Sequence, residues 1–234
     1  MAEVDYFAVL LAVAHAPNAI ASFDVGIDTV AGDGLPVTFG LFNAQGQAIV
    51  IPGTNQATFT VNTSNGFAST SQAVAPIPNN LFDISGGQTA LVKASVAAGS
   101  GQPLANAVLR QKVSGQTKII LGVPPSLKSD LTPLSTGRQV DVAVGDLMSS
   151  TTLFVVNVSP APIDVNIFRG SMTGGTLRFS IQQLGSNAVW SVVLQSADAM
   201  TNLAVQTPTP GGAFFVQLAV DDGQKVDEAT LLPS

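Results

Sequence analysis

Short apolar segments alternate with turn-forming residues along the whole chain. Val, Ile, Phe, Leu and Thr concentrate in these segments, and clusters of Gly, Pro, Asn, Asp and Ser separate them. This pattern is typical of an all-β sandwich or barrel, and the periodicity of amphipathic helices is nearly absent. It predicts strands at residues 4–13, 20–30, 36–42, 47–51, 56–62, 67–74, 89–97, 106–113, 117–122, 138–144, 151–158, 163–168, 175–183, 188–196, 202–206 and 213–220.

Three connections have residues suited to chain reversal. Asn65-Gly66 fits a two-residue hairpin turn with positive φ, and residues 43–46 and 185–187 are rich in Asn and Gly. Such short reversals predict that neighbouring strands are antiparallel.

A more polar stretch interrupted by prolines, Pro124 to Gly137, separates two series of strands. We therefore predict an antiparallel β-sandwich at residues 1–130, with an apolar N-terminal strand, and a second β-sandwich at residues 131–234. The two units are expected to be immunoglobulin-like or jelly-roll-like, and a single domain over the whole chain is the alternative. A loose internal echo relates residues 89–108 to residues 152–167, since both read as strand, small-residue turn and strand.

Residues 87–108 also carry a family pattern. Gly87-Gln88-Thr89 leads into a strand that reaches Val96, and Gly101-Gln102-Pro103 leads into a second strand that reaches Val108. This segment resembles bacterial immunoglobulin-like domains of the invasin and intimin type. The resemblance implies a sandwich used as a spacer or an adhesive module.

Charged residues make up 10% of the chain, against roughly 25% in typical soluble domains. The hydrophobic fraction is 46% and the mean hydropathy is +0.38. The chain must cover itself with uncharged polar residues or hide apolar area against neighbours, so we infer self-association. No apolar run approaches the roughly 20 residues of a membrane-spanning helix, and we expect no membrane span.

Nine basic and fifteen acidic residues give a net charge of −6, and the basic residues form no cluster. Nucleic-acid binding, which needs concentrated positive charge, is therefore not expected. The chain has no cysteine, which excludes disulfides, thiol catalysis and cysteine-ligated metals.

The apolar segment Phe7 to Ala14 is similar in composition to the core of a secretory signal. However, Glu3 and Asp5 stand where a signal has positive charge, and the first basic residue is Lys93. We interpret the segment as a structural strand rather than a cleaved signal peptide, with a short buried helix as an alternative.

Candidate chemistry is sparse, and we predict that the protein is not an enzyme. His15 is the only histidine, so neither a catalytic triad nor a histidine-rich metal site is supported. The C-terminal carboxylates Asp221, Asp222 and Asp227 are the candidate ligands of a calcium ion, because calcium takes several oxygen ligands. Solvated loop carboxylates are the alternative interpretation, and no other cofactor is expected.

The leading hypothesis is a structural subunit that assembles with copies of itself, as a virion component or as an extracellular appendage, filament or surface layer. The apolar N-terminal strand would complete the sheet of a neighbouring copy, and deleting residues 1–16 would then abolish assembly and leave a folded monomer. The lack of a recognisable signal favours the virion over the cell surface. The predicted assembly residues are Val4, Tyr6, Phe7, Val9, Leu10, Leu11 and Val13.

The alternative function belongs to a different class. It is a carbohydrate-binding or adhesive β-sandwich module, whose loops contact a glycan and whose acidic turn holds calcium. It predicts a defined monomer or small oligomer that calcium stabilises, because a ligand that binds only the folded state raises its stability. An enzyme with paired carboxylates ranks third.

Overall fold

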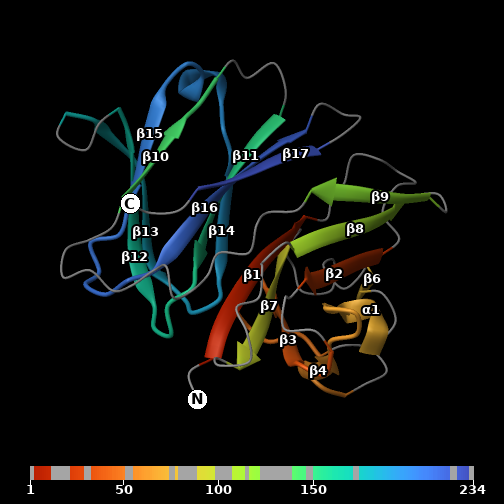
Figure 1. The fold of residues 1–234 in the computed structure, drawn as a ribbon. Helices are drawn as coiled ribbons and strands as arrows, with labels where there is room; N and C mark the ends of the chain where they lie inside the picture. Colours follow the sequence, from red (N-terminus) through yellow and green to blue (C-terminus); the bar gives the residue numbers. More distant parts are fainter. Residues whose placement is uncertain are drawn as a thin grey trace. The chain divides into compact units, whose positions relative to one another are not determined.

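The structure is a computed structural model, and its chain divides into two compact units, Met1–Asp130 (unit 1) and Leu131–Ser234 (unit 2). Nearly all the regular structure is antiparallel β-sheet (Figure 1), as the sequence pattern predicted. The structure describes residues 3–11, 22–28, 33–50, 55–73, 77–78, 89–97, 107–113, 116–121, 139–145, 150–170, 174–221 and 226–231.

Two antiparallel sheets make up the described part of unit 1. One has the strand order β1-β7-β3-β4 and the other has the order β5-β2-β8-β9, with β6 also paired to β2. A single helical turn, α1 (Thr70–Ala73), follows β5. The strands are β1 (Glu3–Leu11), β2 (Ser22–Asp28), β3 (Pro36–Asn43), β4 (Thr58–Asn62), β5 (Phe67–Ser69), β6 (Ile77–Pro78), β7 (Thr89–Ala97), β8 (Ala107–Val113) and β9 (Gln116–Leu121).

Unit 2 also has two antiparallel sheets, with the orders β10-β15-β12-β13 and β14-β11-β16-β17. A 3-10 turn, η2 (Ser196–Asp198), follows β14. The strands are β10 (Gln139–Ala143), β11 (Ser150–Asn157), β12 (Ile163–Arg169), β13 (Thr176–Leu184), β14 (Val189–Val193), β15 (Asn202–Gln206), β16 (Phe214–Asp221) and β17 (Val226–Leu231).

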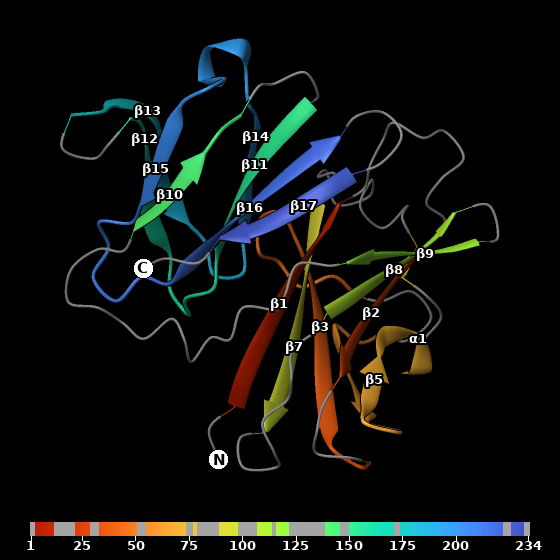
Figure 2. The same ribbon diagram turned by 45° about the horizontal axis from the view of Figure 1, so that its top comes forward.

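The two units share one topology. Apart from the two-residue strand β6, each has eight described strands, and numbering these from one to eight within each unit gives the sheet orders 1-6-3-4 and 5-2-7-8 in both. Figure 2 lets the reader follow the strands of each unit from a second direction. The chain is therefore a tandem repeat of one antiparallel fold. The repeat does not correspond to the echo between residues 89–108 and 152–167, because β7 and β8 are equivalent to β15 and β16 rather than to β11 and β12.

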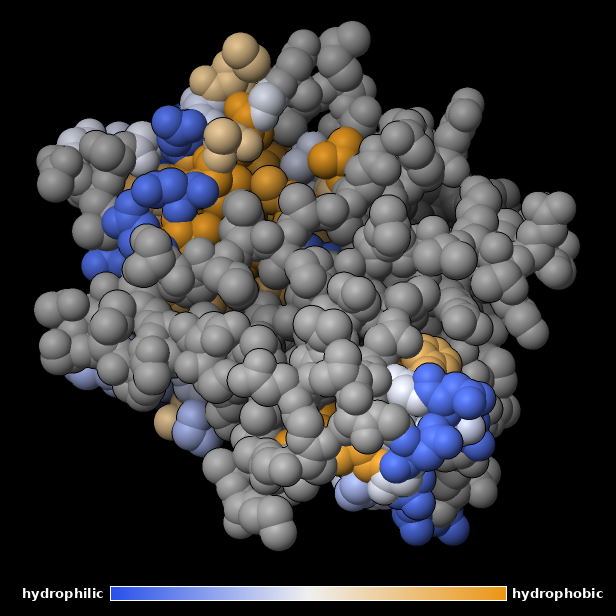
Figure 3. All heavy atoms as spheres, viewed as in Figure 1, coloured by the Kyte–Doolittle hydropathy of each residue, from blue (hydrophilic) through white to orange (hydrophobic). Residues whose placement is uncertain are grey.

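The core of unit 2 lies between its two sheets. Buried and exposed residues alternate along β10 and along most of β12, as expected for strands with one face on a core. Trp190 is half-buried against this core, and its ring centroid lies 5.3 Å from that of Phe179. Figure 3 shows apolar described residues gathered in one area at the upper left of the view, beside hydrophilic ones. The core residues are Val140, Val142, Val144, Leu153, Val155, Ile163, Val165, Ile167, Leu184, Ala188, Leu194, Leu203, Val205, Phe214 and Val216.

In unit 1 the N-terminal strand is part of the chain's own sheet. All nine residues of β1 pair with β7, from Glu3 opposite Ala97 to Leu11 opposite Thr89. The neighbouring strands β3 and β7 supply buried residues to the unit 1 core, and the rings of Phe39 and Phe59 stack at 5.4 Å. The segment is thus a strand, as predicted, and β1 lies at the end of its sheet.

Several predicted elements differ from the structure. Residues 47–50 do not form a strand, because the turn after β3 returns only as far as an isolated bridge between Ala48 and Phe42. The predicted strand at 67–74 ends at Ser69, directly before α1, and the one at 188–196 ends at Val193 before η2. The short strand β6 and the C-terminal strand β17 were not predicted.

The Asn65-Gly66 turn has the predicted backbone but a different role. The φ angles are 52° and 73°, and Ser64 and Phe67 bond to each other across the turn. However, β4 and β5 belong to different sheets, so the turn joins two sheets rather than two paired strands. The predicted reversal at residues 185–187 likewise connects β13 to β14 across sheets, with Asn187 at φ 57°.

Candidate functional site

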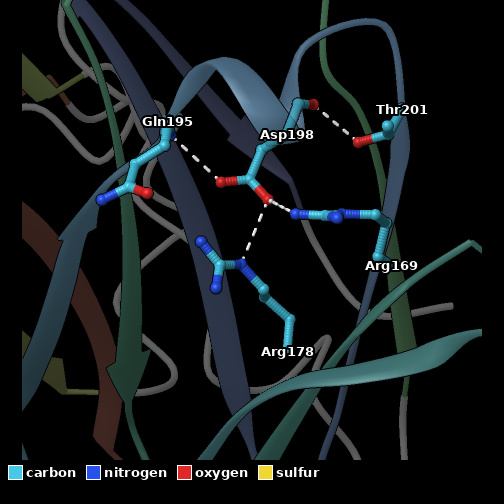
Figure 4. A network of polar contacts seen from close by, with 5 residues as sticks. All are labelled: Arg169, Arg178, Gln195, Asp198 and Thr201. Carbon is cyan, nitrogen blue, oxygen red and sulfur yellow. Dashed lines mark hydrogen bonds and ion pairs between the residues drawn. The ribbon is translucent and has the colours of Figure 1, made fainter.

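Two arginines and a buried carboxylate meet in a charged cluster of Arg169, Arg178 and Asp198 (the Asp198 cluster; Figure 4). Arg169 is the last residue of β12, Arg178 lies in β13, and Asp198 ends η2. The cluster therefore links one sheet of unit 2 to the loop that follows β14 of the other sheet.

An irregularity in β13 places Arg178 in the cluster. Phe168 pairs with Leu177 and Ile167 pairs with Phe179, so Arg178 is the extra residue between two consecutive pairs. A bulge of this kind redirects a side chain relative to the regular alternation of a strand. Arg178 can thus reach the loop beyond the sheet.

Asp198 is almost completely buried, with 1% of its side chain exposed. Its Oδ1 accepts hydrogen bonds from Arg169 Nη2 at 2.6 Å and from Arg178 Nε at 3.2 Å. Its Oδ2 accepts one from the backbone N–H of Gln195 at 3.1 Å, and its carbonyl oxygen accepts one from Thr201 Oγ1 at 2.6 Å. These bonds satisfy the buried carboxylate and fix residues 195–201.

The surroundings keep Asp198 ionised. Burial by itself would raise the pKa of Asp198, but the hydrogen bonds from Arg169, the Gln195 backbone and Arg178, together with the charge of Arg178, outweigh this effect and lower the pKa. Both guanidinium groups are always charged, so the cluster has one positive charge in excess. The side chains of Arg169 and Arg178 are 35% and 30% exposed, so part of this charge faces solvent.

The chemistry of the cluster suits binding rather than catalysis. A buried carboxylate held ionised by two arginines is a poor general base, because its lowered pKa makes it weakly basic. The partly exposed guanidinium groups, in contrast, keep N–H donors that can bind a carboxylate.

A second buried polar site is centred on Asn157. Its Nδ2 donates to the carbonyl oxygens of Ala161, Leu184 and Gly185, each at 2.9 Å, and its Oδ1 accepts from Ser159 N–H at 2.7 Å. Asn157 itself is fully buried. The amide therefore joins the ends of β11 and β13, which is a structural role.

The structure places most of the predicted assembly residues on one strand. Val4, Tyr6, Phe7, Val9, Leu10 and Leu11 all belong to β1, and Val13 lies outside the described residues. The same strand contains a charged residue that the sequence analysis treated only as a flank. Asp5 is buried, and its carboxylate lies 3.1 Å from Lys93 Nζ and accepts a hydrogen bond from Ser95 Oγ at 2.8 Å.

The predicted calcium ligands are only partly described. Asp221 is the last residue of β16 and is paired with Val226, Asp227 is paired with Val220, and Asp222 lies outside the described residues. The two described aspartates are therefore not register partners. In the described part of the chain no three His, Cys, Asp or Glu residues are grouped so as to hold a metal ion. His15 also falls outside the described residues.

Sequence reasoning missed the Asp198 cluster. Its members are separated by up to 29 positions and form no recognised motif. The only available sign was that Arg169 and Arg178, two of only nine basic residues, lie close together in the sequence.

Comparisons with known proteins add little to this picture. No protein-family model and no curated protein matches the chain. A solved structure described as Cowpea mosaic virus top component (CPMV-T), naturally occurring empty particles, is similar at a TM-score of 0.26 and 9% sequence identity, over 100% of this chain and 87% of that chain. A TM-score this low establishes neither a shared fold nor a shared role. None of the helices in the described ranges has the length and apolarity needed to cross a membrane.

Proposed function

We propose that this protein is a structural subunit that assembles with copies of itself, and that the edge strand β1 forms one of the contacts. The observation that carries the proposal is the character of this edge. β1 runs for nine residues, its sequence is EVDYFAVLL, and its register with β7 has no shift. It lies at the end of the sheet, where an added strand can pair.

The other long edge strand in the described residues, β13, differs in the ways that discourage pairing. It also has nine residues, but its pairing with β12 shifts register twice and Gln183 has a positive φ of 54°. Bulges and charged residues are the usual protection of an exposed edge. β1 has no bulge and only two charged residues, Glu3 and Asp5, both near its N-terminal end.

The structure changes how β1 would act in assembly. Because β1 is already paired with β7, it would extend its own sheet toward a neighbour rather than insert into that neighbour as a loose strand. Deletion of residues 1–16 would then remove part of a folded sheet and destabilise unit 1. Substitutions on β1 are therefore a better test than the deletion.

The first measurement is the mass of the native protein by light scattering, with electron microscopy of the same sample. The proposal expects a regular particle or filament. The double variant V9K/L11K should reduce assembly, because edge lysines oppose strand pairing. Its matched control V9T/L11T keeps strand-forming residues and should assemble. Circular dichroism and thermal unfolding of both variants establish that they are folded.

The outcomes separate the candidate functions. A closed shell would favour a virion component, whereas filaments or layers would favour an extracellular appendage or surface layer. A monomer of 23.8 kDa would contradict the proposal. If calcium then raised the unfolding temperature of that monomer and the monomer bound glycans, the carbohydrate-binding module would be supported instead.

A further inference from the structure

We infer that the part of unit 2 around the Asp198 cluster is a second docking surface, and that it binds an acidic surface of another copy of this chain. The inference rests on the proposed self-assembly and names a contact distinct from β1. It follows from three features of the described residues: an exposed apolar side chain, a fixed loop and an unbalanced positive charge.

Exposed apolar residues lie near the cluster residues in the sequence. Four large hydrophobic residues are exposed in the described ranges, and three of them neighbour cluster residues. Leu177 (52% exposed) directly precedes Arg178, Met200 (78%) follows Asp198 by two positions, and Val193 (56%) precedes Gln195 by two. Alternation along the strands turns Leu177 and Val193 toward the outer faces of the two sheets, so Met200 is the exposed apolar side chain of the loop that Asp198 fixes. Only Val50 lies elsewhere, in unit 1.

The loop that carries Met200 is held in place. Asp198 fixes its first part, while Met200 N–H donates to the Gly145 carbonyl at 3.1 Å and Val144 N–H donates to that of Thr201 at 2.8 Å. A surface fixed before binding loses little conformational entropy when a partner docks.

A methionine at position 200 does not favour the stability of the fold. Its φ of 53° lies in the left-handed region, where Gly or Asn is preferred over a long side chain. The residue thus combines a strained backbone with a highly exposed apolar side chain. Neither property stabilises the fold, and both are explained if the side chain contacts a partner. Met and Arg are also among the residues enriched in protein interfaces.

Charge identifies the partner. The cluster has two guanidinium groups and one carboxylate, whereas the whole chain has fifteen acidic and nine basic residues. The net negative charge of the chain favours an acidic surface of another copy as the partner of the cluster. Two Asp198 clusters facing each other would repel, so the contact joins different surfaces of the two copies. Such head-to-tail contacts build rings or extended filaments, as a self-assembling subunit requires.

Substitutions of Met200 test this surface without touching the ion pairs. M200D and M200K both replace the apolar side chain at a position whose φ is positive, so the backbone is matched between them. They differ in the sign of the charge that they add. M200D should raise the protein concentration needed for half-assembly about tenfold or more, and M200K should raise it much less. V50D, at an exposed apolar position of unit 1, should leave this concentration unchanged. Light scattering measures assembly, and thermal unfolding verifies each fold.

Each other outcome has a definite meaning. Equal effects of M200D and M200K would overturn the acidic partner, and no effect of either would overturn the docking surface. In both cases assembly of the unmodified protein, and its loss in V9K/L11K, would leave the proposed function intact. A monomeric unmodified protein would overturn both proposals together.

Discussion

Lys93 Nζ lies 3.1 Å from Asp5 Oδ2, and this ion pair joins the edge strand β1 to its neighbour β7. The Asp5 side chain is only 4% exposed, whereas that of Lys93 is 27% exposed. A carboxylate removed from water needs such partners, because an uncompensated buried charge is strongly destabilising. The pair therefore fixes β1 in the sheet whose edge we propose as an assembly contact.

The first prediction concerns this pair. K93M should lower the free energy of unfolding by about 1–3 kcal/mol, because it removes an ion-pair partner of the buried Asp5 carboxylate. The double variant D5L/K93M removes both charges and should be less destabilised than the sum of the two single variants D5L and K93M. Urea unfolding of the four proteins measures this coupling. Additive losses would show that the pair contributes nothing to the anchoring of β1.

The second prediction concerns acid stability. The pKa of Asp198 is lowered in the folded protein relative to its ordinary value of 3.8, so the ionised form stabilises the fold at neutral pH. This stabilisation is lost as the pH falls from about 4 through the lowered folded pKa. D198N should lower the free energy of unfolding at pH 7 by about 2–4 kcal/mol, because both arginines lose their carboxylate.

The pH dependence distinguishes this role from general damage to the fold. The difference in stability between the unmodified protein and D198N should shrink as the pH falls below about 4, since the carboxylate is protonated first in the unfolded state and then, below its lowered folded pKa, in the folded state as well. D141N, at an exposed aspartate of β10, is the matched control and should have little effect at either pH. A difference that stays constant down to pH 2 would contradict the assignment.

The third prediction concerns Asn157. N157D should destabilise the protein by about 3 kcal/mol or more, because a carboxylate replaces the amide donor that faces three carbonyl oxygens. N166D is the control. Asn166 Oδ1 accepts a hydrogen bond from Ser180 Oγ, and a carboxylate retains this acceptor. Equal unfolding midpoints for the two variants would mean that the Asn157 hydrogen bonds do not stabilise the fold.

Local pattern was enough to predict the fold class and most strands, but not how the strands pair. The alternation in β10 and β12 and the turn residues at 65–66 are visible in the sequence, and all three have the predicted local structure. The sheet to which each strand belongs depends on contacts between distant residues. For this reason the turn at Asn65 was assigned to a hairpin, and the shared topology of the two units went unseen.

The polar sites could not be predicted either, because they too depend on contacts between residues that are distant in the sequence. Asn157 reaches Leu184 across 27 positions, and Asp198 reaches Arg169 across 29. The residue types in these sites are common in surface loops, and only folding brings them together in buried positions. In the sequence, Asp5 also looks like an ordinary charged residue near the start of a strand. Only the pairing of β1 with β7 places Lys93 beside it.

The fourth prediction concerns a buried glutamine. Gln217 lies in β16 and is completely buried, and neither Nε2 nor Oε1 has a hydrogen-bond partner in the described part of the protein. Its register partner on β11 is the buried Phe154. Burying an amide without partners costs about 1–3 kcal/mol.

Q217M, which is similar in size, should therefore raise the free energy of unfolding by about 1–2 kcal/mol, and Q217E should lower it. Q182M, at an exposed position of β13, should stay within about 0.5 kcal/mol. A loss of stability in Q217M would show that the amide is hydrogen-bonded in solution, and that this face of β16 packs against a polar group rather than an apolar one.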